Sequence, residues 1–180
     1  MKKSIFFTLL ALITWNQCFC QSETPIFIGL QPNITVEPFY DEGEFDLDIV
    51  PLVFEASVGL RTNIKITPIV NYHFGGVNNG ISDLAIYSVV PIFLKAKEER
   101  TDRPYGFYLG PVLGFGRNIL NSHYTTTVGA EPGYMFETEN RFTISMGLQL
   151  GGSYFSYKNT EPNKWVSHWG PKFSFGFWIN

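Results

Sequence analysis

The 180-residue chain has few charged side chains and no long apolar run. Charged residues make up 16% of it, against about 25% in ordinary soluble domains. A disordered chain would be richer in charge and poorer in aromatic residues, which are 17% of this one. A transmembrane helix needs about 20 consecutive apolar residues, which excludes a helical-bundle membrane protein. The net charge of −3 argues against nucleic acid as a partner, because domains that bind it are normally basic.

Cysteine is scarce as well, and both cysteines fall in a segment that we expect to be removed. Lys2 and Lys3 give a positive start, and residues 5–13 form a short apolar core. Cys18 and Cys20 then occupy the small-residue positions of an export signal cleaved after residue 20. Lipid attachment to a cysteine is an alternative, although neither cysteine follows a small residue. Cleavage would leave no thiol for a disulfide, a nucleophile or a metal site.

The predicted mature chain, residues 21–180, is a single domain with 11 basic and 16 acidic side chains, a net charge of −5. Apolar and polar residues alternate over most of it. The alternation is clearest in residues 141–154, where every second residue from Phe142 to Leu150 is apolar. A period of two is typical of a β-strand. The same pattern predicts seven further strands, at 26–39, 45–60, 64–74, 84–95, 105–116, 123–137 and through the C-terminal stretch to Ile179.

The length of these segments and the composition of their less apolar face indicate the environment. Each segment has roughly 11–16 residues, whereas strands of globular proteins average about 5–6 and tilted membrane strands need about 9–11. The less apolar face is rich in Gly, Ser and Thr with scattered charges, as in a narrow polar lumen surrounded by lipid. We therefore predict an all-β fold, an eight-stranded antiparallel transmembrane up-and-down β-barrel. A soluble barrel and a ten-stranded barrel are the alternatives.

Prolines recur inside the predicted strands, where each removes one ladder hydrogen bond, and six of them are singled out. We interpret them as local bulges or kinks that help a small barrel to curve. The alternative is a weakened seam through which a lipid enters sideways. The six are Pro51, Pro68, Pro91, Pro111, Pro132 and Pro171.

The signal-like start, the eight alternating segments and the aromatic final strand resemble the small outer-membrane β-barrels of Gram-negative bacteria. The chain is similar to the OmpA/OmpX/OmpW-like group, and most of all to its compact Bacteroidetes type. The resemblance implies an outer-membrane location, contact with outer-membrane lipids and insertion by the barrel-assembly machinery, which recognises a C-terminal aromatic residue. This chain ends in Asn180, two residues after Trp178. The resemblance implies no single activity, because such barrels serve as anchors, pores, receptors and enzymes.

Three histidines, His73, His123 and His168, are expected to face the lumen near the outer rim. Together they are candidate ligands for Zn²⁺ or Cu²⁺. We favour a role as hydrogen-bonded lumen residues, because their strands are not mutual neighbours, and predict no cofactor. Serine precedes both His123 and His168, and a hydrolase would use such a Ser–His pair. Adjacent strand residues, however, point to opposite faces, so the two groups would not meet. We therefore predict no enzyme activity and keep a lipid-modifying enzyme as a distant alternative.

Charged residues on the less apolar face are expected to pair across the lumen. Eight strands leave an interior just filled by side chains, so we predict a salt-bridged interior and not an open channel. A narrow pore or small-ligand receptor is the alternative. The residues are Glu37, Glu55, Lys65, Lys95, Glu131, Arg141 and Lys172.

The expected surfaces for a partner are the wall, the rim and the short loops. Trp165 and Trp169, which we expect in the last loop, are candidate contacts for an external carbohydrate or protein. We predict a structural or accessory role in the outer membrane, docking with another outer-membrane protein of a larger assembly.

Overall fold

The computed structural model describes residues 24–35, 41–75, 79–96, 103–138, 140–158 and 162–179. The predicted export signal and Glu37 lie outside these residues. Within them the regular structure is β, and no helix is long and apolar enough to cross a membrane. The strands are β1 (Ile26–Leu30), β2 (Ile34–Thr35), β3 (Phe45–Asp48), β4 (Leu52–Ser57), β5 (Asn63–Phe74), β6 (Gly80–Val89), β7 (Ile92–Phe93), β8 (Gly106–Asn118), β9 (His123–Glu137), β10 (Phe142–Tyr157) and β11 (Lys164–Ile179).

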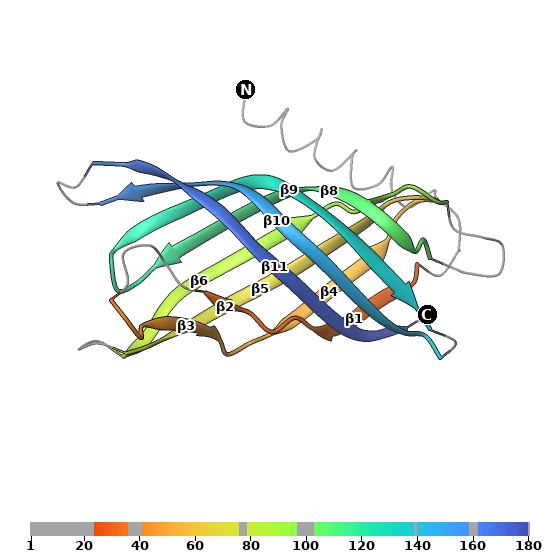
Figure 1. Ribbon diagram of the computed structural model, residues 1–180, viewed down its shortest axis with the longest axis horizontal. Coiled ribbons are helices and arrows are strands. Elements are labelled where there is room, and N and C mark those ends of the chain that lie inside the picture. The colour runs from red at the N-terminus through yellow and green to blue at the C-terminus, as the bar shows by residue number, and fades with distance from the viewer. Residues whose placement is uncertain are drawn as a thin grey trace, which may run out of the picture.

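These segments form one barrel of eight antiparallel strands (Figure 1). Three barrel strands are each broken into two segments, β1 with β2, β3 with β4, and β6 with β7. Both β3 and β4 pair with β5, and both β6 and β7 pair with β8. The ring closes where β1 pairs with β11, from Ile26 opposite Ile179 to Leu30 opposite Phe175. The predicted eight-stranded antiparallel barrel is confirmed.

The two ends of the barrel differ in what they carry (Figure 1). One end carries the β8–β9 and β10–β11 connections, and we call it the loop end. The other carries Ile26, the β9–β10 turn and Ile179, and we call it the terminal end. In Figure 1 the loop end lies at the left and the terminal end at the right.

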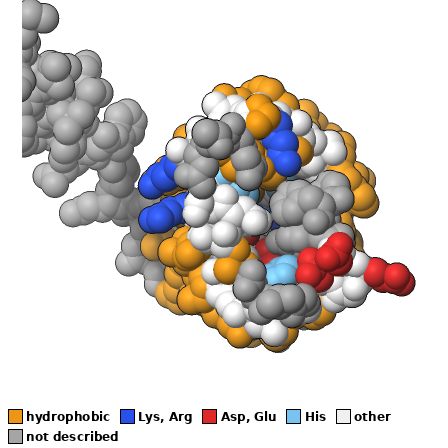
Figure 2. Space-filling view, turned by 90° about the vertical axis from the view of Figure 1, so that its left-hand side faces the viewer, with side chains coloured by type: hydrophobic (Ala, Val, Ile, Leu, Met, Phe, Trp, Pro, Cys, Tyr) orange, Lys and Arg blue, Asp and Glu red, His pale blue; other side chains and the backbone are white. Residues whose placement is uncertain are grey.

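Apolar side chains of the strands point outward along the whole barrel. In β8, Phe107 and Leu109 are 64% and 56% exposed, whereas the intervening Tyr108 is 4% exposed. In β10, Met146 and Leu148 are 50% and 40% exposed, as the alternation predicts. Seen from the loop end, hydrophobic side chains form the rim of the molecule (Figure 2). We call this outward surface the wall.

The prolines divide into two groups. Pro51 and Pro91 lie where a barrel strand is interrupted, between β3 and β4 and between β6 and β7. Their carbonyls still accept hydrogen bonds across the interruption, from the backbone N–H groups of Gln31 and Asn63. At these two sites the strand is interrupted, whereas the interpretation of the prolines as bulges or kinks that curve the barrel stays a prediction. The others lie within continuous strands with their rings toward the wall: Pro68, Pro111, Pro132 and Pro171.

Candidate functional site

The lumen is closed by apolar packing in its terminal half. Phe27 contacts Trp178 with ring centroids 5.5 Å apart, and Phe93 contacts Tyr108 at 5.4 Å. The indole nitrogen of Trp178 donates a hydrogen bond to Thr143 Oγ1 at 3.1 Å, so the inward-facing indole has a polar partner. We call this cluster the apolar plug; its members are Phe27, Val53, Phe93, Tyr108, Met135 and Trp178.

Inward glycines make room for the large side chains of neighbouring strands. A Cβ atom at Gly133 would lie less than 3 Å from the ring and hydroxyl of Tyr108. At Gly147, a Cβ atom would meet the side chain of Glu131 in the same way. Small residues therefore alternate with large ones across the narrow interior, as filling a small barrel requires.

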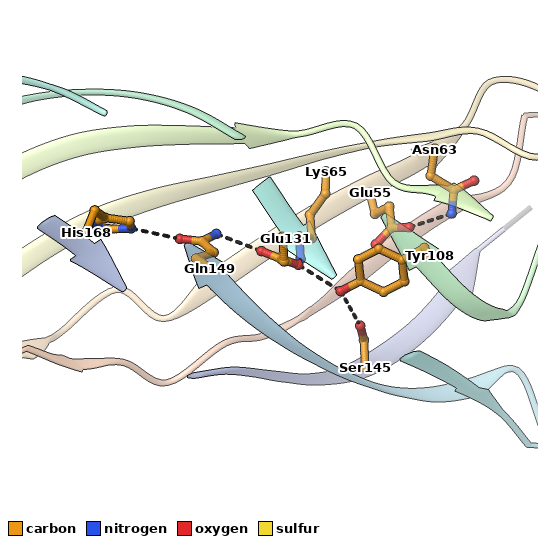
Figure 3. A network of polar contacts seen from close by, with 8 residues as sticks. All are labelled: Glu55, Asn63, Lys65, Tyr108, Glu131, Ser145, Gln149 and His168. Atoms are coloured by element: carbon orange, nitrogen blue, oxygen red, sulfur yellow. Dashed lines mark hydrogen bonds and ion pairs between the residues drawn. The ribbon is translucent and has the colours of Figure 1, made fainter. Parts of the chain in front are cut away.

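A buried carboxylate lies next to the plug, at the centre of the lumen (Figure 3). Glu131 is fully buried and forms an ion pair with Lys65, which is 3% exposed. Tyr108 donates its hydroxyl to Glu131 Oε1 at 2.7 Å, and Gln149 Nε2 donates to Oε2 at 2.7 Å. A buried charge is stable only when it is both paired and hydrogen-bonded, and Glu131 meets both conditions.

Further polar contacts lie on both sides of Glu131, and together these side chains span the lumen (Figure 3). Glu55 lies opposite Lys65 in the β4–β5 ladder and accepts a hydrogen bond from the amide of Asn63 at 2.5 Å. On the other side, His168 Nε2 lies 3.2 Å from the Oε1 atom of Gln149. The network therefore connects side chains of strands that are far apart in sequence. We call it the central network: Glu55, Asn63, Lys65, Tyr108, Glu131, Ser145, Gln149 and His168.

The loop half of the lumen contains a cavity of about 680 Å³. The cavity is lined by polar side chains, among them Asn33 and Lys172, and by the rings of Tyr87 and Phe155. Lys172 donates a hydrogen bond to Asn33 Oδ1 at 2.9 Å. The volume falls within the range of about 300–1,000 Å³ that is typical of small-molecule sites.

A second polar cluster joins three strands near the loop end. Asp46 on β3 lies 2.9 Å from His73 Nδ1 on β5 and accepts a hydrogen bond from Ser82 Oγ on β6 at 2.9 Å. The carboxylate lies between the hydroxyl and the imidazole. A serine nucleophile needs its base within hydrogen-bond reach, and this order of groups does not provide that contact. We therefore assign the cluster a role in holding β3, β5 and β6 together.

The three predicted histidines occupy separate environments. His73 contacts Asp46, His123 stacks on Phe155 with ring centroids 4.6 Å apart, and His168 contacts Gln149. In the described part of the chain, no three His, Cys, Asp or Glu residues are grouped as a metal ion would require. Ser122 is exposed while His123 is buried, as expected for adjacent residues that point to opposite faces.

The predicted lumen charges are brought together only in part. Glu55, Lys65 and Glu131 meet in the central network, and Lys172 lines the cavity. The predicted lumen position does not hold for two residues, because both lie beyond the strand ends where alternation no longer fixes a face. Arg141 is exposed in the β9–β10 turn with a φ of 59°, and Lys95 is exposed after β7.

Several side chains of the lumen were missed as candidates. Tyr108, Gln149 and Asn63 supply hydrogen bonds to the two buried carboxylates. Their inward positions could have been found from the period of two. Trp165 and Trp169 were predicted to be available to a partner, and they are 64% and 71% exposed. Both lie on β11 near the loop end.

The chain was compared with protein-family models, with curated proteins and with solved structures, and it matches none of them. The site is therefore interpreted from its own geometry.

Proposed function

We propose that this protein is an integral β-barrel of the bacterial outer membrane with a structural or accessory role. In its strand pattern and size it resembles the OmpA/OmpX/OmpW-like barrels, and most of all the compact Bacteroidetes type. The observation that supports the proposal is a barrel whose wall is apolar while most of the buried side chains that line its lumen are polar or charged. This is the reverse of a soluble barrel, whose apolar face points inward and whose outside is charged.

The wall would be costly in water. Monomeric soluble proteins rarely expose contiguous apolar patches larger than a few hundred Å². Here outward Leu, Ile and Phe side chains of neighbouring strands adjoin, as in Ile86 of β6 opposite Phe115 of β8, which are 51% and 52% exposed. Burial of apolar surface yields about 25 cal/mol per Å², so a lipid environment stabilises this wall strongly.

Aromatic contacts near both ends of the barrel support the same location. Near the terminal end, Phe107 contacts Tyr134 with ring centroids 4.6 Å apart. Near the loop end, Tyr154 contacts Trp165 at 5.3 Å. Membrane barrels carry aromatic belts at their two lipid–water boundaries. These rings are positioned to form such belts.

The filled terminal half of the lumen favours a structural role over a narrow pore. An ion moving along the barrel axis would meet the central network and then the apolar plug, in which Phe27 and Val53 are 1% and 0% exposed. In planar bilayers we expect no conductance above background. Steady single-channel steps would contradict this part of the proposal.

Single-tryptophan variants test the location of the wall. Proteins that retain only Trp169 or only Trp178, with every other Trp changed to Phe, are reconstituted in phosphatidylcholine vesicles brominated on the acyl chains. Trp169 is 71% exposed on the wall and Trp178 is 2% exposed in the plug, so bromine should quench Trp169 several-fold more strongly. Equal quenching of the two residues, or failure of the protein to insert, would overturn the membrane location.

The accessory role is tested separately. We propose that the wall and the exposed Trp165 and Trp169 contact another outer-membrane protein, because large aromatic side chains dominate binding at protein interfaces. Gentle detergent extraction followed by mass spectrometry should recover a stoichiometric partner, which Trp165→Ala together with Trp169→Ala would release. Recovery of the protein as a lone monomer would contradict docking.

A small-ligand receptor is the second candidate function. The cavity in the loop half favours it, because this space lies beside the filled central network and carries polar groups among apolar ones.

A further inference from the structure

Among the described residues, the barrel wall has a gap between β2 and β11. The ladder between β1 and β11 stops where Leu30 lies opposite Phe175. Beyond that pair, β2 pairs with β3, and among the described residues no ladder joins residues 31–35 to β11. Continued at the same register, the ladder would place Asn33 opposite Lys172. In Figure 1 the two segments move apart toward the loop end.

The cavity reaches this gap. Its lining includes both the inward His168 and Lys172 and the outward Trp169 and Phe173 of β11. Consecutive residues of both segments line the cavity, 32–35 and 167–173, as expected of a space that runs along a strand edge. The β10 edge is closed by continuous pairing along residues 142–155. The cavity therefore passes on the β2 side.

The two faces of the gap differ in chemistry. On the outer face, Ile34 is 67%, Trp169 71% and Phe173 39% exposed, so this face is apolar. On the inner face, Lys172 Nζ bridges the gap to Asn33. That amide is the one hydrogen-bond partner of Lys172 in the described part of the chain, and no carboxylate there lies within 4.0 Å of its ammonium. An ammonium has three donors, which leaves donors for an anionic ligand.

The backbone edges at the gap need a polar neighbour. Unpaired N–H and C=O groups that face lipid cost several kcal/mol each and are tolerated where they line a cavity. The described stretch of residues 31–35 spans only about 15 Å at 3.3 Å per residue, and it is fixed at one end by the β1–β11 ladder. The cavity of about 680 Å³ has room for a small anionic head, and the apolar outer face of the gap can pack a hydrocarbon chain.

We propose that the cavity binds a single-chain amphiphile with an anionic head, which enters sideways through the gap. The head accepts hydrogen bonds from Lys172 Nζ and lies near His168. The hydrocarbon chain leaves between β2 and β11, along Ile34 and Phe173, and continues in the bilayer. The proposal rests on the membrane location proposed above and gives the receptor function a class of ligand.

Binding of 11-bromoundecanoate to the protein in phosphatidylcholine nanodiscs tests this proposal. Quenching of Trp169 should contain a saturable component that undecanoate removes by competition and acetate does not. The methyl ester of the probe partitions into the same bilayer without an anionic head, and we expect no saturable component for it. Saturation by the ester would overturn the anionic head. Competition by acetate at the same concentration would show a small-anion site and overturn the amphiphile.

Two pairs of variants locate the site. Lys172→Met should weaken binding at least tenfold, since charge-assisted hydrogen bonds are the strong ones. Lys164→Met changes an exposed lysine of the same strand and should stay within twofold. Gly170 lines the cavity, and a Cβ atom there would meet nothing within 4 Å. Gly170→Leu should therefore occupy part of the cavity and weaken binding several-fold. Gly80→Leu adds the same side chain at an equally open site outside the cavity and should leave binding unchanged.

The outcomes separate this proposal from the proposed location. If the wild-type protein does not enter nanodiscs, the membrane location fails. If it inserts and Trp169 shows only non-saturable quenching, or if Lys172→Met binds as tightly as wild type, the amphiphile site fails while the location stands. Heat-modifiable mobility on gels checks that each variant has folded.

Discussion

The two halves of the lumen are built from the same strands and the same alternation, yet they differ in packing. In the terminal half, inward side chains such as Val53 and Met135 are 0% and 2% exposed. In the loop half, the inward His168 and Lys172 are only partly buried and surround a cavity of about 680 Å³. The strand that closes the ring pairs with β11 in the first half and turns away from it in the second. Closure of the ring, and not residue type alone, therefore determines how tightly the interior packs.

The central network lies at the boundary between the two halves, and removal of one charge should produce the largest effect. Lys65→Met leaves the fully buried Glu131 without its ion-pair partner, which is expected to lower the free energy of unfolding by about 3–5 kcal/mol. Urea unfolding in detergent micelles measures the loss. The double variant Lys65→Met with Glu131→Gln removes both charges and should recover part of it. A loss below about 1 kcal/mol for the single variant would show that the ion pair does not hold the boundary.

Truncation of one apolar side chain in each half should sharpen the comparison. Met135→Ala opens a void in the plug and is expected to cost about 2–4 kcal/mol. Ile69→Ala removes a side chain that already borders the cavity, so most of the cavity term is absent and about 1 kcal/mol is expected. The same urea titration compares the two variants. Equal losses would mean that the loop half is packed as tightly as the terminal half.

The smallest expected effect comes from a methyl group added at an open site, measured against the same addition at a tight site. Gly133→Ala forces a Cβ against Tyr108 and should cost about 1–3 kcal/mol. Gly170→Ala adds the same atom where nothing lies within 4 Å, and its unfolding free energy should stay within about 0.5 kcal/mol of wild type. If Gly133→Ala were as stable as Gly170→Ala, the tight fit of Tyr108 over β9 would be wrong.

Much of the barrel could be predicted from the sequence because a period of two fixes which face each residue occupies. The alternation from Phe142 to Leu150 predicted the wall, and the inward positions of Glu55, Lys65 and Glu131 followed from the same rule. The rule fails where a strand ends, as at Arg141. It describes faces within a strand and carries no information on where two strands separate.

The gap between β2 and β11 could not be predicted from the alternation. Continuous pairing was expected along residues 26–39, whereas β1 ends at Leu30 and β2 begins at Ile34 after a Gln-Pro-Asn interruption. Pro32 lies inside this predicted strand but was not among the six prolines interpreted as bulges or kinks. The sideways seam was sought at prolines within the strands, but Pro68, Pro111 and Pro171 remain in paired ladders. Where two neighbouring strands pair or separate depends on how the whole barrel closes, and the alternation within one strand does not show it.

The short ladder between β1 and β11 also bears on how the barrel forms. It joins the residues that are farthest apart in sequence, Ile26 with Ile179, while β10 pairs along residues 142–155 with β11, the next strand in the chain. Loop-closure entropy must be overcome before such a distant pairing gives any stabilisation. We expect hairpins to assemble first into an open, curved sheet, and the first strand to dock last. The junction between β1 and β11, the shortest between neighbouring barrel strands in the described part of the chain, would then also be the last to form.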